Sequence, residues 1–162
     1  MSNYYPPVGF YFGLSFTGAS SANDASFQEV SGITAELGVV EVKEGGENRF
    51  AHRLPDRAKY SNLVLKRGLM LASSGVGAWC MDTIAGSAST FETRDVTVSL
   101  YDAGGNPLMT WNFVAAWPVK WSISDLDAQA NKVVVESLEL AYTYFTTGKV
   151  KELGPTGFFT PP

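Results

Sequence analysis

Large apolar side chains alternate with small or polar ones along much of this chain. In its first clear example, Phe10, Phe12, Leu14 and Phe16 occupy every second position. Successive side chains of a β-strand point to opposite faces, so this spacing places four apolar groups on one face of a strand. Further segments rich in Val, Ile, Thr and aromatic residues predict more strands. These are expected at 27–34, 36–43, 62–67, 94–102, 110–123 and 132–145.

Two connections and one helix complete the predicted elements. The segment 102–107 contains two glycines between two strand patterns, which predicts an antiparallel hairpin, and a second hairpin is expected to connect through 124–131. A helix is expected near 69–84, capped by Ser73 or Ser74. Its apolar face is expected to include Trp79, Met81 and Ile84. The pattern therefore predicts an all-β fold with one flanking helix.

The composition indicates that the protein binds another protein. The chain has 162 residues, enough for one domain, and 17% of them are charged. Globular proteins usually carry roughly 25% charged residues, so part of this surface is expected to face another protein. The net charge of -4 argues against a protein that binds nucleic-acid phosphates.

The charge is also unevenly placed along the chain. Residues 36–68 contain seven bases and five acids, a local charge of +2, which leaves -6 for the rest. A mildly basic edge of this kind suits head-to-tail stacking of identical copies against an acidic edge. A solvated segment of mixed charge is an equally good interpretation of the charge alone.

No arrangement of residues predicts catalysis or a bound cofactor. One cysteine, Cys80, and one histidine, His52, are too few for a disulfide or a multi-histidine metal site. The Gly-x-Ser-x-Gly motif of serine hydrolases is absent, and His52 between two arginines is interpreted as a surface histidine. Cys80 is interpreted as a small core residue. We expect no enzyme activity, no cofactor and no metal.

Glutamate 136 is an unusual carboxylate for a predicted strand. Glu136 falls on the same side as Leu138 and Leu140, whereas Glu139 falls on the opposite side, so the two glutamates cannot share a substrate. A buried carboxylate requires a partner. The candidate partners are Lys66, Arg67 and Lys120.

The N-terminal residues and the apolar runs indicate whether the chain is exported or inserted into a membrane. Residues 1–23 lack a basic stretch and are interrupted by prolines and glycines, so no signal peptide is expected. No run approaches the roughly 20 apolar residues of a membrane helix, so no integral membrane segment is expected. We therefore expect a protein made in the cytoplasm.

Several short motifs follow one another in a defined order along the chain. In the first half the motifs are Phe27-Gln-Glu-Val-Ser-Gly-Ile33, Glu44-Gly-Gly-Glu-Asn48, Leu54-Pro55, Lys59-Tyr60 and Asn62-Leu-Val-Leu-Lys-Arg-Gly68. In the second half they are Val98-Ser-Leu-Tyr-Asp102, Gly105-Asn-Pro107, Trp111-Asn-Phe113, Ala116-Trp-Pro-Val-Lys-Trp121, Asp125-Leu126 and Val135-Glu-Ser-Leu-Glu-Leu140. In these motifs and their order the chain resembles the tail tube proteins of contractile phages and phage-tail-like contractile injection systems. The resemblance covers about Val8 to Tyr144.

The resemblance implies an antiparallel β-barrel or sandwich of the tail tube type that assembles into a hexameric ring. Rings would stack into a hollow inner tube that sheath contraction drives through a target envelope, with a lumen that can hold cargo. The implied partners are copies of the chain itself, a sheath protein, and baseplate, spike and cap proteins, within a virion tail or an injection system. The hemolysin-coregulated protein of type VI secretion is a more distant relative with the same ring architecture.

The resemblance also assigns parts of the chain. It implies a tail tube domain at 1–145. Residues 146–162 extend past the shared region and are expected to form a C-terminal arm. The connection between about residues 43 and 60 would contact neighbouring copies. The residues expected to assemble rings and stacks are Lys43, Glu44, Gly45, Gly46, Glu47, Asn48, Arg49, Arg53, Arg57, Lys59 and Tyr60. The expected core is Phe10, Phe12, Phe16, Trp111, Phe113, Trp117, Trp121, Leu138 and Leu140.

Two alternatives remain open at this point. Within the family, the chain can be a tube initiator or baseplate hub component that forms only a few rings. From a different class, it can be a monomeric β-barrel that encloses an apolar pocket for a ligand.

Overall fold

The computed structural model describes residues 11–17, 27–43, 45–46, 49–69, 74–87, 90–126 and 133–149. These residues form nine strands and one helix. In chain order the elements are β1 (Tyr11–Phe16), β2 (Glu29–Ser31), β3 (Ala35–Val42), β4 (His52–Tyr60), β5 (Leu63–Gly68), α1 (Gly75–Ala85), β6 (Arg94–Tyr101), β7 (Pro107–Ile123), β8 (Val135–Ala141) and β9 (Tyr144–Lys149).

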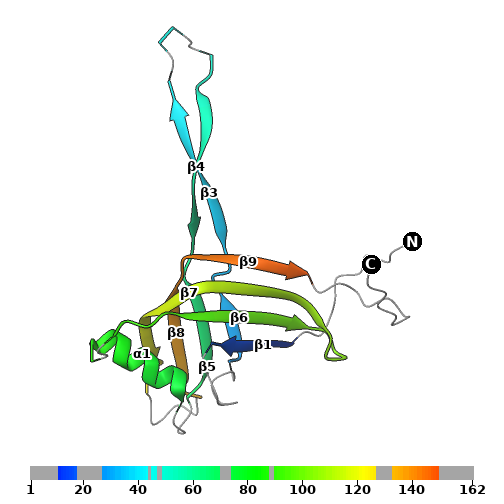
Figure 1. The fold of residues 1–162 in the computed structure, drawn as a ribbon, viewed down its shortest axis with the longest axis vertical. Coiled ribbons are helices and arrows are strands. Elements are labelled where there is room, and N and C mark those ends of the chain that lie inside the picture. The colour runs from blue at the N-terminus through cyan, green and yellow to red at the C-terminus, as the bar shows by residue number, and fades with distance from the viewer. Residues whose placement is uncertain are drawn as a thin grey trace.

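Two antiparallel sheets share the long strand β7 and enclose the core (Figure 1). The first half of β7 pairs with β6 on one side and β9 on the other. The second half pairs with β8, which continues through β5 to β2, while β1 extends the first sheet beyond β6. The predicted all-β fold with one helix is confirmed, as are the hairpins β6–β7 and β7–β8.

A bend in β7 lets one strand serve both sheets. Ala115 adopts a positive φ of 52°, in the left-handed region that non-glycine residues seldom occupy. The carboxylate Oδ1 of Asp95 accepts a hydrogen bond from the Ala115 N–H at 2.9 Å. The pairing of β6 with β7 shifts register close by, and such irregularities bend a strand and increase its twist. The chain therefore turns the corner between the sheets near Ala115.

The core lies between the inner faces of the sheets. Leu14, Val96 and Phe113 come from one sheet, and Leu63 and Leu138 come from the other. Four of the expected core residues are buried: Phe16, Phe113, Leu138 and Leu140. Two more, Phe12 and Trp111, are partly buried and pack against the core, and Trp117 and Trp121 are half-buried. Phe10 lies outside the described residues.

Helix α1 begins as predicted but presents a different face. The Ser74 hydroxyl accepts a hydrogen bond from the Gly77 N–H at 3.2 Å and caps the helix. Val76, Trp79 and Cys80 are its buried side chains, and burial raises the pKa of the Cys80 thiol to about 12. The predicted face was wrong because a helix turns about 100° per residue, which puts residue 81 nearly opposite residue 79. Met81 and Ile84 are accordingly exposed.

The strand expected at 132–145 is two strands in the structure. β8 ends at Ala141 and β9 starts at Tyr144, and the two pair with different halves of β7. Period-two spacing continues through the break, so the sequence pattern does not reveal it. β9 continues to Lys149, so residues 146–149 of the predicted arm are strand. Residues 150–162 lie outside the described residues.

One buried ion pair joins the two central strands of the second sheet. Arg67 Nε on β5 donates to Glu136 Oε2 on β8 at 2.7 Å, and the two side chains are only 3% and 9% exposed. Trp121 Nε1 donates to the other carboxylate oxygen at 2.7 Å, and Arg67 also reaches the Ser74 hydroxyl. The expected buried carboxylate and its arginine partner are therefore confirmed, and the pair ties the start of α1 to the sheet.

Removing one member of this pair is expected to destabilise the fold strongly. Arg67→Met leaves the Glu136 carboxylate buried without its cation, and should lower the free energy of unfolding by about 3 to 5 kcal/mol. Urea unfolding followed by tryptophan fluorescence measures this change. The control is Lys66→Met, since Lys66 contacts Glu29 at the same 2.7 Å but both side chains are exposed.

The control variant should cost less than about 1 kcal/mol. The double variant Arg67→Met with Glu136→Gln keeps an acceptor for Trp121 and should recover part of the loss. Equal losses for Arg67→Met and Lys66→Met would contradict the argument from burial.

Candidate functional site

A long hairpin formed by β3 and β4 stands away from the body of the molecule along its longest axis (Figure 1). Every residue from His52 to Lys59 is exposed. No strand was predicted within the connection at about 43–60, and its second half is β4. The strand was not predicted because this stretch contains charged residues and a proline. Such residues are typical both of loops and of exposed edge strands.

The hairpin is a continuation of two strands of the body. β2 pairs with β5, and the same two chain segments then continue outward as β3 and β4. Gly32 lies between β2 and β3, opposite Asn62 between β4 and β5. The φ of Gly32 is +85°, and a Cβ at this position would lie 2.0 Å from the carbonyl oxygen of Asn62. The Asn62 side chain donates to Glu139 Oε1 on β8 at 2.7 Å. Gly32 and Asn62 therefore fix where the hairpin leaves the sheet.

Aromatic rings anchor the base of the hairpin. Tyr60, at the end of β4, lies 5.6 Å from Phe145 and 5.9 Å from Tyr142 between ring centroids. Phe113 packs 4.8 Å from Tyr142 and joins this cluster to the core. Tilted and edge-to-face contacts of this kind hold rings in fixed relative positions. The root of the hairpin is thus rigidly seated although its strands are exposed.

The hairpin leaves several large apolar side chains exposed. Leu37 is 63% exposed and Phe50 is 60% exposed. Val39, Val40, Val42 and Leu54 are each at least 40% exposed. Exposed apolar side chains gathered on one element are typical of surfaces that bind a partner. The hairpin is therefore a candidate interaction surface.

Its charges are largely balanced within the hairpin. Residues 35–60 contain five acids and five bases. Glu41 and Arg53 face each other, with 4.0 Å between carboxylate oxygen and Nε, and Glu36 is paired in register with Lys59. The excess of +2 in residues 36–68 comes from Lys66 and Arg67, and both form ion pairs in the body.

The structure places most of the predicted assembly residues on this hairpin. The segment between the two strands contains Lys43, Gly45, Gly46 and Arg49. Strand β4 contains Arg53, Arg57 and Lys59, and Tyr60 is half-buried at its end. The remaining three, Glu44, Glu47 and Asn48, lie outside the described residues. The predicted assembly residues did not include Leu37, Val39, Val40 and Leu54. A strand was predicted at 36–43, but the pattern of a strand does not show whether another sheet covers its side chains.

A second exposed feature is the pair of free strand edges of the first sheet. In the described part of the chain, β1 pairs only with β6 and β9 pairs only with β7. Each edge therefore presents unpaired backbone N–H and C=O groups. The two edges lie on opposite sides of one four-stranded sheet and run antiparallel to one another, so copies can be added side by side.

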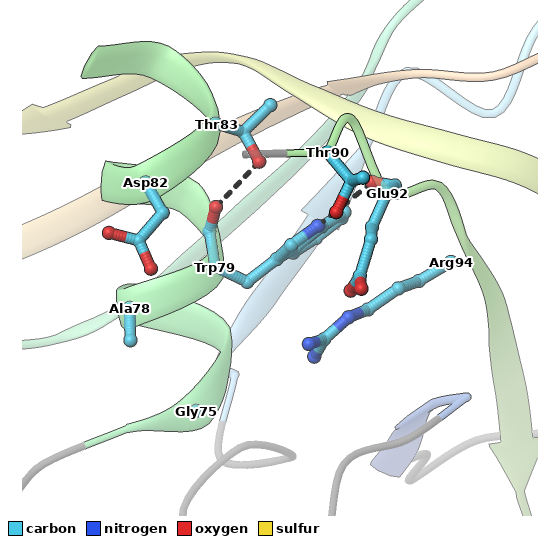
Figure 2. Close-up of a pocket in the computed structure, with 8 residues that line it drawn as sticks. All are labelled: Gly75, Ala78, Trp79, Asp82, Thr83, Thr90, Glu92 and Arg94. Carbon is cyan, nitrogen blue, oxygen red and sulfur yellow. Dashed lines mark hydrogen bonds between the residues drawn. The ribbon is translucent and has the colours of Figure 1, made fainter. Parts of the chain in front are cut away.

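A polar hollow lies between α1 and the segment 90–94 (Figure 2). Its volume is about 280 Å³, and its groups bind one another. The Arg94 guanidinium lies 5.0 Å from the centre of the Trp79 ring, and Trp79 Nε1 donates to the Glu92 carbonyl at 3.0 Å. Thr83 donates to the Trp79 carbonyl at 2.7 Å. The contacts of Trp79 with Arg94 and Glu92 attach the helix to the start of β6, whereas the Thr83 bond lies within the helix.

The described residues contain no group of three or more His, Cys, Asp or Glu side chains placed to hold a metal ion. None of their helices has the length and hydropathy that a membrane crossing requires.

The junction glycine provides a direct test of the hairpin geometry. Gly32→Ala introduces a Cβ in conflict with the Asn62 carbonyl and a strained positive φ, so it should destabilise the protein by at least about 2 kcal/mol. Circular dichroism during urea unfolding measures the loss. The matched control is Gly45→Ala, where a Cβ meets no atom within 4 Å. Loss of stability in the control alone would contradict this assignment.

Residues 8–146 match the family model described as "T4-like virus tail tube protein gp19". No curated protein sequence matches the chain. A chain in the six-fold symmetrised baseplate of the anti-feeding prophage is similar in structure. It is 31% identical with a TM-score of 0.77, and the match covers 91% of this chain and 98% of that one.

Two other solved structures share the fold at lower identity. A chain from the sheath-tube complex of an extracellular contractile injection system, PVC, in its extended state is 24% identical, with a TM-score of 0.75 and coverage of 91% of this chain and 95% of that chain. Hcp1 from Flavobacterium johnsoniae is 15% identical, with a TM-score of 0.54 and coverage of 86% and 95%.

Proposed function

The chain belongs to the T4-like tail tube protein family, and we propose that its copies close into hexameric rings that stack into the hollow inner tube of a contractile particle. It is a structural protein of a phage tail or contractile injection system. The observation that carries the proposed stacking is the exposed β3–β4 hairpin, whose apolar side chains a single copy leaves in water. Contact with another copy removes that surface from water.

The free edges of β1 and β9 supply the contact within a ring. Adding the β1 edge of one copy to the β9 edge of the next continues the antiparallel order and pairs the backbone groups that each edge exposes. The interface is heterologous, because two different edges meet, and such interfaces close into rings when the rotation between copies divides a full circle. The related anti-feeding prophage baseplate has six-fold symmetry.

The related structures also indicate partners. The similar chains come from assemblies described as a baseplate, a tube-terminating cap and a sheath-tube complex. We propose that this tube contacts a sheath on its outside, a baseplate with a spike at one end and a cap at the other. The lumen would hold cargo, and we propose no catalytic activity for the chain itself.

A second candidate function is a tube initiator that forms only the first rings on a baseplate. The observation in its favour is that the 31% identical chain belongs to a baseplate structure. The length of the assemblies separates the two functions. An inner tube subunit forms many stacked rings, whereas an initiator forms one or two.

Electron microscopy of the purified protein at high concentration tests the proposed function. We expect hexameric rings and stacks of rings, with longer tubes when sheath and baseplate proteins are coexpressed. Sedimentation velocity provides an independent measure of particle size. Exclusively monomeric protein under both conditions would contradict the proposal and favour a monomeric β-barrel.

Chemical cross-linking tests the proposed contact within the ring. Ser15 on β1 and Thr146 on β9 are exposed and lie near the two free edges. The double variant Ser15→Cys with Thr146→Cys should give a ladder ending at the hexamer when treated with a short bismaleimide. Each single variant is the control, since Cys80 is buried and its raised pKa keeps it unreactive. Rings without any ladder would contradict the β1–β9 contact.

A further inference from the structure

One face of the first sheet is built from small polar residues. Cross-strand pairing between β1, β6, β7 and β9 aligns two complete rows on this face, which we call the polar rows, and none of their members is buried. The first row is Ser15, Thr97, Asn112 and Thr146, and the second is Gly13, Ser99, Thr110 and Gly148. The polar rows therefore offer hydroxyl and amide groups, and they contain no charged or large apolar side chain.

The opposite face of the same strands is the core face. Leu14, Val98 and Phe113 alternate with members of the polar rows along their strands, point the other way and are buried. Trp79 of α1 and Leu138 of the second sheet belong to the same buried cluster. The helix and the second sheet therefore lie on the core side of the first sheet, and no described element covers the polar rows.

The margins of the polar rows add little charge. At one end Tyr11 and Tyr101 pair across β1 and β6 and stack with 5.1 Å between ring centroids. At the other end lies Asp95, which is the one charged side chain among the described strand residues of this face. Its Oδ1 accepts a hydrogen bond from the Ala115 N–H. The face is therefore close to neutral along the whole length of its strands.

The geometry of a closed ring decides which way the polar rows face. Six copies of the four-stranded first sheet, joined through β1 and β9, form a barrel of 24 strands. With a strand spacing of about 4.8 Å and a tilt of about 40°, the backbone diameter is roughly 50 Å. A second layer packed about 10 Å inside this barrel would leave each copy an arc of roughly 15 Å.

The second sheet does not fit into that arc. Its strands β7, β8, β5 and β2 span about 19 Å side by side, and α1 adds a further cylinder about 10 Å wide. On the outside of the barrel the circumference is larger and accommodates both. The second sheet and α1 therefore lie outside, and the polar rows face the axis of the ring.

We propose that the polar rows form an uncharged lumen wall that admits polypeptide cargo of either net charge. This inference rests on the proposed function, because a lumen exists only when the ring closes. Hydroxyl groups both donate and accept hydrogen bonds, so the wall pairs equally with the N–H groups, the C=O groups and the water around a polypeptide. Each such bond replaces one with water and contributes little net free energy. Cargo is therefore guided without being held tightly.

Charge favours a polypeptide over a nucleic acid as the occupant. Proteins bind nucleic-acid phosphates through Lys and Arg side chains, and the polar rows contain neither. The rows also lack the carboxylates that would attract a basic polypeptide and repel an acidic one. Polypeptides that differ in net charge therefore meet the same surface.

Cysteine accessibility tests the position of the polar rows. Asn112→Cys places a thiol in the first row, and the control Met81→Cys places one on the exposed side of α1. In assembled tubes both thiols should react with a small fluorescent maleimide. A maleimide coupled to a globular protein wider than the lumen should label Asn112→Cys at least about tenfold less than Met81→Cys, because the barrel excludes it. Dissociated subunits of both variants should react with both reagents.

A neutral dye attached to Asn112→Cys then measures the charge preference of the lumen. The probes are short oligoglutamate and oligolysine peptides that carry a nitroxide, which quenches the dye on contact. At low ionic strength both peptides should quench, to extents that agree within about threefold, because the wall carries no fixed charge that favours either. The control adds Thr97→Glu to the labelled tube. This carboxylate in every copy should favour oligolysine by at least about tenfold, and added salt should reduce the preference.

Several outcomes would overturn the proposal. These are equal labelling of Asn112→Cys and Met81→Cys tubes by the wide reagent, and quenching by one peptide alone in tubes that retain Thr97. Stronger quenching by a nitroxide-labelled oligonucleotide than by both peptides would overturn it in favour of nucleic acid. Electron microscopy of the unmodified protein keeps the two proposals apart. Absence of rings contradicts the proposed function, whereas tubes with a charge-selective lumen contradict only the present inference.

Discussion

The structure depends on one strand being hydrogen-bonded in two sheets. β7 pairs with β6 and β9 before its bend and with β8 after it. Because a single continuous strand crosses from sheet to sheet, the inner faces are held opposite each other and the core can fill the space between them. The bend requires the left-handed backbone of Ala115, which the Asp95 carboxylate stabilises. The free edges and the hairpin have their positions because this frame is fixed.

The assembly surfaces differ in the physical interaction that they offer. The edges of β1 and β9 present backbone hydrogen-bonding groups, whose direction fixes the orientation of a neighbour. The hairpin presents apolar side chains, which favour contact without fixing direction as strictly. A ring closed by the first kind and stacked by the second would be rigid within each layer. It would gain its length from many repeated apolar contacts.

Residue types and their spacing were sufficient to predict several features of the structure. The alternation in β1, β6 and β8, the Ser74 cap and the glycine turn before β7 are local properties, and the structure confirms the elements they predict. The burial of Glu136 was also predicted, because Val134, Leu138 and Leu140 lie on the same face of the strand. The face of α1 was predicted wrongly, since residues 79 and 81 were grouped against the helical period. β4 was missed because exposed strands and loops have similar compositions.

Residue identity and spacing along the chain were enough to predict the β-rich class, the helix and the family. They also contain no recognisable catalytic motif. Only the three-dimensional arrangement shows that β2 and β5 continue outward as a hairpin, and that ion pairs with Glu29 and Glu136 neutralise the excess charge of residues 36–68. These features depend on which distant segments pair, and local patterns carry no information about the covering of a strand face.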